Sequence, residues 1–257
     1  MRPILVVDTE TTGLNVKTAE IIEIAVCDVE TETMESFLLR PVEGIPENVQ
    51  KLTGIDEEMV KDQPTFFEKI EDVIKLLRPG DNPIYVAHHA PYDMPVIRNN
   101  LDFAGLTEKD TEWLSRENWL CTNRLLRRAH GHKPRLKYTN LPAAIEFFNL
   151  DVPEADTVHR AEADVWMALR LFNQLRKNDY EDLSDEELID LCWQRYVFAR
   201  FPFGKHKGKL LKDIPTGYFV WMCDNMDSLN PKDERFDPDL YSTIEKEIER
   251  RVADLGD

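Results

Sequence analysis

Residues 4–7 (Ile-Leu-Val-Val) form an unbroken apolar run of β-prone residues, and Asp8, Thr9 and Glu10 follow it directly. An apolar run without polar alternation is typical of a strand covered on both faces, so it predicts a central strand that continues into the two acids. Side chains at positions i and i+2 of a strand point to the same face, with their Cα atoms roughly 6–7 Å apart. The Asp8 and Glu10 carboxylates are therefore expected to project together, with Thr9 facing away, and two anions this close need a cation. The alternative is a simple strand end at which Gly13 supplies the turn.

The segments that follow predict further strands first and then an alternation of strands with helices. Hydrophobic patterning predicts strands at 20–29, 34–40, 84–89 and 118–121. Apolar residues at helical spacing predict helices at 64–77, 91–106, 122–130, 141–150 and 160–175. This order is typical of an α/β fold in which a mixed sheet is flanked by helices.

A change in composition divides the chain, and we expect domains at 1–178 and 179–257, the second being a small, mostly helical module. The chain becomes strongly acidic at the start of this module. Within the acidic stretch, Ser184 and Glu187 form the S-x-x-E pattern of a capping box, which predicts the start of a helix. We expect this helix to run to Phe198.

The smaller module contains a Gly- and Lys-rich segment and a predicted last helix. The sequence GKHKGK at 204–209 is not a Walker loop, because the spacing is one residue short and Leu210 replaces the Ser or Thr that holds magnesium. A basic loop that touches backbone phosphates is the preferred interpretation. Asp237 as the cap and Pro238 in the first turn predict a helix over 237–252.

Length, charge and cysteine usage limit the classes of protein. The chain has 257 residues, a hydrophobic fraction of 42% and a formal net charge of −17. This charge argues against a protein that coats nucleic acid non-specifically. The first apolar run is too short for a signal peptide and no stretch has the length of a membrane span, so we expect a cytoplasmic protein. The cysteines lack C-x-x-C spacing, which indicates neither a disulfide framework nor a cysteine zinc site.

Two basic segments, 118–145 and 191–212, interrupt the acidic chain, and neither contains an acid. Their cationic residues are Arg124, Arg127, Arg128, Lys133, Arg135 and Lys137 in the first, and Arg195, Arg200, Lys205, Lys207, Lys209 and Lys212 in the second. Each basic segment alone fits a solvated face. Two of them in a chain with a cluster of acids favour a polyanion that binds over a metal site.

Three further residues, Asp93, His159 and Asp164, join Asp8 and Glu10 as an ordered set. Asp93 follows the fourth predicted strand, and Asp164 lies in the first turns of a late helix. Because a spacing of five does not place two residues on one helical face, His159 is expected on the loop before that helix. Each residue alone has an ordinary explanation as a helix-start acid or a capping-region histidine. Four carboxylates and one mobile base, in this order, match what a two-metal phosphodiesterase requires.

The same five residues resemble the complete signature of the DEDD exonucleases of the histidine subtype, which include the proofreading subunit of bacterial DNA polymerase III, ribonuclease T and oligoribonuclease. The sequence KLTGI at 51–55 also resembles a segment that these proteins place before their first helix. The resemblance covers roughly residues 1–178 and implies a ribonuclease H-like mixed sheet. Residues 201–222 and the sequence DTETTGLN at 8–15 are similar to motifs of exodeoxyribonuclease X, which implies a DNA substrate.

The resemblance implies 3′→5′ removal of nucleoside 5′-monophosphates from DNA 3′ ends, single-stranded or duplex, with no membrane and no stated oligomeric state. Crowded carboxylates raise one another's pKa unless hard cations neutralise them, so two Mg²⁺ ions are expected, with Mn²⁺ able to substitute. Asp8 would bind both ions, Glu10 and Asp164 would complete the site of the catalytic ion, and Asp93 would support the second. His159 would take the proton from the attacking water.

The loop after the first strand supplies the expected substrate-binding residues. Backbone amides around Thr11 and Thr12 are predicted to bond the terminal 3′-hydroxyl, and Leu14 to pack on the last base. By similarity, Leu14 with Asn15 would open a duplex end. The alternative for Leu14 is a loop residue buried in the core.

Two other functions remain open at this stage. A 3′→5′ exoribonuclease is one, since nothing in the sequence contacts a 2′-hydroxyl in a recognisable way. A nuclease-like module that binds nucleic acid without cleaving it is the other, although such a module needs no general base.

Overall fold

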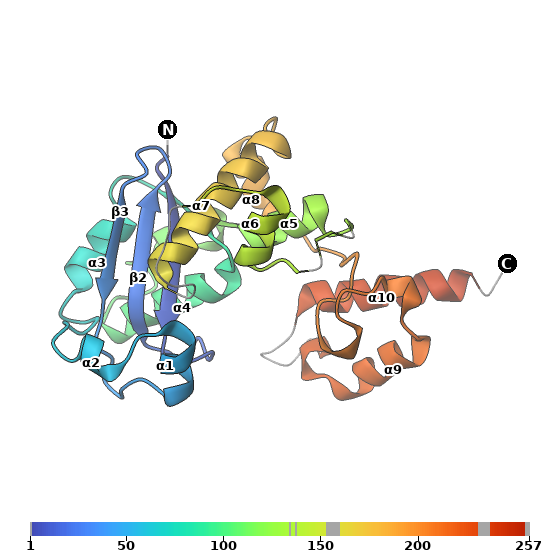
Figure 1. The fold of residues 1–257 in the computed structure, drawn as a ribbon, viewed down its shortest axis with the longest axis horizontal. Coiled ribbons are helices and arrows are strands. Elements are labelled where there is room, and N and C mark those ends of the chain that lie inside the picture. Colours follow the sequence, from blue (N-terminus) through green and yellow to red (C-terminus); the bar gives the residue numbers. More distant parts are fainter. Residues whose placement is uncertain (1, 134, 137, 153–159, 231–236, 255–257) are drawn as a thin grey trace. The chain divides into compact units, whose positions relative to one another are not determined.

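The computed structural model describes residues 2–133, 135–136, 138–152, 160–230 and 237–254. The chain divides into two compact units (Figure 1). Unit 1 consists of residues 1–123 and 140–192, and unit 2 of residues 124–139 and 193–257. This division differs in extent from the predicted domains 1–178 and 179–257, which stay a prediction.

Unit 1 is built on a five-stranded sheet whose strands lie in the order β3-β2-β1-β4-β5. The strands are β1 (Ile4–Thr11), β2 (Ile21–Asp28), β3 (Met34–Leu38), β4 (Ile84–Ala87) and β5 (Trp119–Cys121). The first three pair antiparallel, whereas β4 and β5 continue the sheet parallel to β1. The predicted mixed sheet is confirmed. Its central strand is β1, as expected from the unbroken apolar run, and the side chains of Leu5, Val6 and Val7 are buried.

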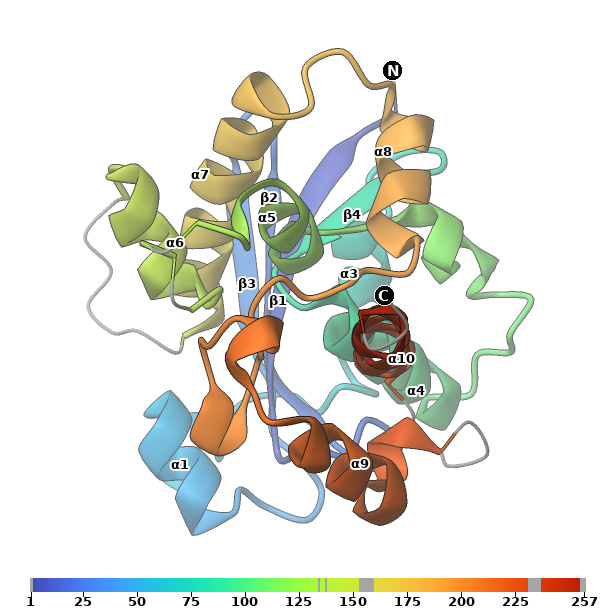
Figure 2. The same cartoon turned by 90° about the vertical axis from the view of Figure 1, so that its right-hand side faces the viewer.

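Helices cover both faces of this sheet. Those of unit 1 are α1 (Glu47–Thr53), α2 (Glu57–Val60), α3 (Ile70–Leu77), α4 (Ala90–Phe103), α6 (Leu141–Phe148), α7 (Ala161–Asn178) and α8 (Asp185–Trp193). Two 3₁₀ turns, Glu112–Leu114 and Arg116–Asn118, precede β5. Helix α7 packs on β1 and β2 and against α6, while α3 and α4 lie on the opposite face (Figure 1; Figure 2). The central strand is therefore enclosed, and functional side chains can leave it only at its end.

The helix expected at 64–77 is shorter in the structure and begins at Ile70. The Glu68 carboxylate accepts hydrogen bonds from both the amide and the hydroxyl of Thr65, at 2.8 and 3.0 Å. Such a local side-chain bond stabilises a turn in place of a helix. The helix predicted from the apolar periodicity is therefore present, but its predicted start at residue 64 was wrong.

Unit 2 is a small helical assembly with its own core. It contains most of α5 (Thr122–His130), α9 (Thr216–Asn225) and α10 (Pro238–Ala253), with 3₁₀ turns at Gly204–His206, Leu211–Asp213 and Asp227–Leu229. The cap of α10 is as predicted, since the Asp237 carboxylate accepts from the amides of Asp239 and Leu240. The core residues are Phe198, Phe201, Leu211, Ile214, Phe219, Met222, Leu229, Leu240 and Ile244.

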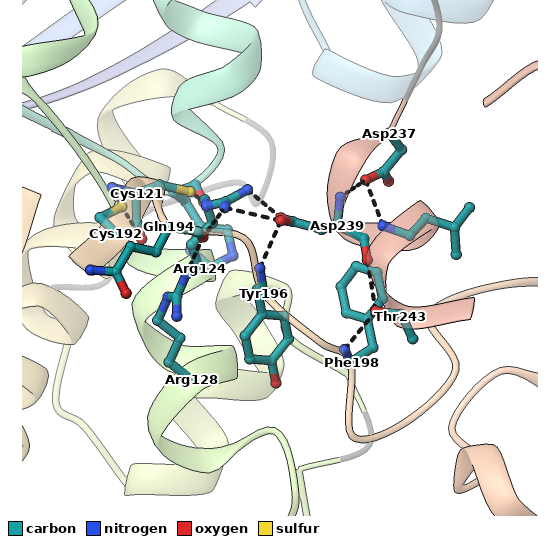
Figure 3. Close-up of polar contacts among 12 residues, drawn as sticks. Cys121, Arg124, Arg128, Cys192, Gln194, Tyr196, Phe198, Asp237, Asp239 and Thr243 are labelled. Atoms are coloured by element: carbon teal, nitrogen blue, oxygen red, sulfur yellow. Dashed lines mark hydrogen bonds and ion pairs between the residues drawn. The ribbon is translucent and has the colours of Figure 1, made fainter. Parts of the chain in front are cut away.

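Helix α8 begins as predicted and ends earlier than predicted. The capping box is present, because the Ser184 amide donates to the Glu187 carboxylate at 2.8 Å and the Glu187 amide donates to the Ser184 hydroxyl at 3.2 Å. The helix stops at Trp193 and does not continue to 198. Beyond Trp193, the Tyr196 amide donates to the Asp239 carboxylate at 2.9 Å (Figure 3). The Phe198 amide donates to the hydroxyl of Thr243 on α10 at 2.9 Å. These partners replace the helical carbonyls.

Arginines of the first basic segment make contacts within unit 2. The Arg124 guanidinium pairs with the Asp239 carboxylate and donates to the Gln194 carbonyl, which also accepts from Arg128 (Figure 3). The Arg127 guanidinium lies 5.2 Å from the centre of the Phe198 ring. These arginines are therefore bound within the protein and hold α5 to the segment after α8 and to α10.

Three of the four cysteines are buried, Cys223 is exposed, and all four are free. None of the helices in the described part of the chain is long and apolar enough to cross a membrane.

Candidate active site

Three of the predicted acids meet at the end of the central strand. Asp8 and Glu10 leave β1 on the face that α7 covers, and Asp164 comes from the first turn of α7. One carboxylate oxygen from each residue lies within 4.8 Å of the others. The two-residue period of the strand places the first two side chains together, and the packing of α7 on β1 adds the third.

Asp93 reaches the same end of the sheet from the opposite face. It lies in the first turn of α4, is only 3% exposed, and accepts a hydrogen bond from the Thr9 hydroxyl at 2.9 Å. Thr9 faces away from the Asp8 and Glu10 side, as expected, and this is why it can hold Asp93. Asp93 is not one of the three acids whose oxygens lie within 4.8 Å of one another, but its charge raises the pKa of Asp8.

The electrostatics of these acids fit a site that binds a cation. Burial is the largest cause that raises the pKa of Asp8 well above its usual range, and the charges of Asp93, Asp164, Glu10 and Glu23 add to it. Burial, followed by the charges of neighbouring acids, raises the pKa of Glu10 to about 8. The pKa of Asp93 is raised to about 7, mainly by burial and against the lowering effect of the Thr9 hydrogen bond. A cluster of oxygen donors that repel one another fits a hard divalent cation.

Glu23 was not predicted as a site residue. It lies on β2 directly opposite Glu10 and is 1% exposed. Its carboxylate accepts from the Arg160 guanidinium at 2.6 and 3.0 Å and from the Ala161 amide at 3.0 Å. Glu23 thereby holds the first residues of α7 and, through them, Asp164. The signal in the sequence was an acid in the middle of the apolar run at 20–29, a place where a charged residue needs a partner.

His159 lies outside the described residues, so its predicted role stays a prediction. The chain that follows it is fixed, because Arg160 and Ala161 are both bound to Glu23.

The loop after β1 is held by its own hydrogen bonds. The Thr12 amide donates to the Glu20 carbonyl at 2.9 Å. The predicted bonding of a terminal 3′-hydroxyl by backbone amides around Thr11 and Thr12 stays a prediction. The Thr11 hydroxyl donates to the Gly13 carbonyl, which also accepts from the hydroxyl of Tyr92, a residue that sequence reasoning did not select.

Leu14 is 89% exposed, which excludes the alternative that it is buried in the core. The Asn15 side chain accepts from the Lys17 amide at 3.1 Å and shapes the turn beside it. The contact of these two residues with substrate stays a prediction.

Comparison with known proteins agrees with this arrangement. The exonuclease family model (RNase_T) matches residues 5–172. The chain belongs to the exonuclease family. It is 30% identical over 231 residues to exodeoxyribonuclease 10 of Escherichia coli (strain K12), a match that covers 88% of this chain and 93% of that protein. It is 33% identical over 172 residues to the DNA polymerase III subunit epsilon of Aquifex aeolicus, covering 65% of this chain and 77% of that one.

Solved structures show the same fold. Exonuclease X in complex with 5′ overhanging duplex DNA matches with a TM-score of 0.54 and 27% identity, over 74% of this exonuclease and 99% of that chain. Residues 186–226 of the exonuclease match a second family model, described provisionally as a quorum-sensing-regulated virulence factor. As a family member with this acidic cluster, the exonuclease is a metal-dependent hydrolase of phosphodiester bonds.

Proposed function

We propose that the exonuclease removes nucleoside 5′-monophosphates from the 3′ ends of DNA with the help of two Mg²⁺ ions, for which Mn²⁺ can substitute. The observation that carries the proposal is the meeting of Asp8, Glu10 and Asp164 within 4.8 Å, with Asp93 beside them. The similarity to exodeoxyribonuclease 10 over almost the whole chain supports DNA as the substrate. The catalytic part would lie in the predicted domain 1–178, and 179–257 would be an accessory module.

Each residue has a distinct role in this proposal. Asp8 would hold both ions, Glu10 and Asp164 would complete the site of one, and Asp93 would support the other. The bound ions would supply an activated water and would stabilise the charge that forms on the leaving 3′-oxygen. His159 would remove the proton from the water as the general base.

Substrate binding is proposed at the loop after β1. Leu14 offers a large apolar side chain to solvent, which suits packing on the last base of the strand. Asn15 would assist it in opening a duplex end, and the Thr11 segment, fixed through Gly13 and Tyr92, would face the terminal nucleotide.

The test uses DNA and RNA oligonucleotides of the same sequence, labelled at the 3′ or the 5′ end, with and without Mg²⁺. We expect immediate release of labelled mononucleotide from 3′-labelled DNA and a ladder of shortened products from 5′-labelled DNA, both abolished by EDTA. Asp164→Asn should abolish both reactions. Faster cleavage of RNA would identify an exoribonuclease instead, and binding without cleavage by the parent chain would show a non-catalytic module.

A further inference from the structure

Unit 2 contains a pocket that the proposed active site does not use. Its volume is about 660 Å³, and its walls are formed by Lys205, His206, Pro215, Gly217, Tyr218 and Trp221. We call it the Trp221 pocket. It lies between the Gly- and Lys-rich turn and the first turns of α9, so every lining residue belongs to unit 2.

Two aromatic rings form a platform in the Trp221 pocket. The Tyr218 and Trp221 rings stack with their centres 5.7 Å apart and their planes inclined by 23°. Tyr218 is also packed on the core, because its ring contacts Phe201 edge to face. Trp221 is 51% exposed. The Trp221 ring, stacked on a tyrosine ring that the core supports, therefore presents a large flat surface to solvent. Such a surface is the usual form of a stacking platform for bases.

The polar groups of the pocket suit an anionic ligand. None of its six lining residues is acidic, and the Lys205 ammonium lies 4.9 Å from the centre of the Tyr218 ring. The Nδ1 atom of His206 is buried and has no hydrogen-bond partner among the residues that the structure describes. The same turn carries a second cation next to a ring, since the Lys207 ammonium lies 4.5 Å from the centre of the Tyr138 ring.

Charge is unevenly divided between the two units. Unit 2 contains 17 Lys and Arg against 12 Asp and Glu, whereas unit 1 contains 15 against 37. A chain with a net charge of −17 thus carries a net positive unit, and the open aromatic pocket lies in that unit. Positive charge combined with exposed rings is the composition of surfaces that bind single-stranded nucleic acid.

We propose that the Trp221 pocket binds single-stranded DNA, with one base stacked on Trp221 and the neighbouring phosphate near Lys205. This site shares no residue with the acidic cluster, and binding to it requires neither a 3′ end nor a metal ion. The inference goes beyond the proposed function and does not rest on it.

The test measures the binding of a fluorescent, circular, single-stranded oligothymidylate to the full chain in EDTA, by fluorescence anisotropy. The circle has no 3′ end and cannot be degraded, so the result does not depend on the exonuclease reaction. We expect Trp221→Ala to weaken binding by about 5- to 150-fold, the range for the loss of one stacked base. Lys205→Gln should reduce the slope of log Kd against log salt by about 0.7, the value for one phosphate contact on a single strand.

Gly217→Leu provides a variant that blocks the pocket without removing a contact. Gly217 lines the pocket within α9, and apart from its chain neighbours and the backbone of its own helix, a Cβ atom there would meet no atom within 4 Å. Leucine also favours the helix by roughly 0.5–1 kcal/mol over glycine, so loss of binding would not result from unfolding. Val220→Ala is the matched control, since Val220 is equally exposed on the same helix and does not line the pocket.

Loss of binding in both Trp221→Ala and Gly217→Leu, with parental affinity in Val220→Ala, supports the proposal. Parental affinity in Trp221→Ala and Gly217→Leu overturns it, and so does a parent chain that does not bind the circle. Neither of those outcomes would bear on the release of mononucleotides from 3′ ends, which is tested separately.

Discussion

Replacing Asp8 by asparagine is expected to stabilise the metal-free protein while it destroys the metal site. Ligand oxygens of Asp8 and Glu10 lie within 4.8 Å of each other. At an effective dielectric constant of about 20, two unit charges at that separation repel by roughly 3.5 kcal/mol. This value is an upper limit, because the pKa of Glu10 is about 8 and only about half of the Glu10 carboxyls are ionised at pH 8. Both side chains are also partly open to water, so we expect a gain of about 2 kcal/mol in the free energy of unfolding at pH 8. For a folded unit of this size, the melting temperature should rise by about 4–8 °C.

The effect has a predicted pH dependence. The pKa of Glu10 is about 8 and that of Asp93 about 7 in the folded protein, above their ordinary values of 4.5 and 3.8. Protons therefore bind the folded state more tightly than the unfolded state. The resulting stability is fully present below about pH 4 and is lost as the pH rises through 7–8. The melting temperature of the parent in EDTA should fall over this range, and that of Asp8→Asn should fall less.

The assay is thermal unfolding in EDTA at pH 5 and pH 8, repeated with saturating Mg²⁺. Mg²⁺ at about 100 times its Kd should stabilise the parent by roughly 2.7 kcal/mol and leave Asp8→Asn nearly unchanged. Glu71→Gln is the matched control, because Glu71 is an exposed acid on α3, outside the cluster. A lower melting temperature for Asp8→Asn at pH 8 in EDTA, or equal stabilisation of both proteins by Mg²⁺, would refute the charge-repulsion argument.

Three further predictions concern residues outside the metal ligands. Glu23→Gln weakens the ion pair that holds Arg160, so the apparent affinity for Mg²⁺ should fall about 10- to 100-fold, with an unchanged circular dichroism spectrum. The affinity is measured from the reaction rate as a function of Mg²⁺ concentration, and an unchanged dependence would mean that α7 needs no anchor at Glu23. Leu14→Ala should keep the parental melting temperature and slow digestion of duplex ends more than of single strands, and equal rates on both would contradict a role in opening ends. Asp239→Asn breaks the ion pair with Arg124 and should destabilise unit 2 by about 3–5 kcal/mol. The measurement is the rate of proteolysis of the C-terminal region, which should increase, and a rate equal to that of the parent would show that the ion pair is dispensable.

The sequence alone determined the features that depend on neighbours within a few positions. The two-residue period of a strand placed Asp8 and Glu10 on one face, and an unbroken apolar run identified β1 as the central strand. Capping chemistry located two helix starts, at Ser184 and Asp237. Each of these rests on local geometry, which is the same in any fold, and so the pattern was sufficient.

The tertiary structure decided what depends on residues far apart in the chain. Glu23 and Arg160 are separated by 137 positions, and only the packing of α7 on β2 brings them together. Helix α8 ends at Trp193 because the amides beyond it find partners on α10, and no local signal records that competition. The Thr12 amide donates to the Glu20 carbonyl across the loop, a partner that no local pattern in the sequence indicated. A hydrogen bond or an ion pair forms with whichever partner the packing supplies, and the sequence pattern of one segment does not contain that information.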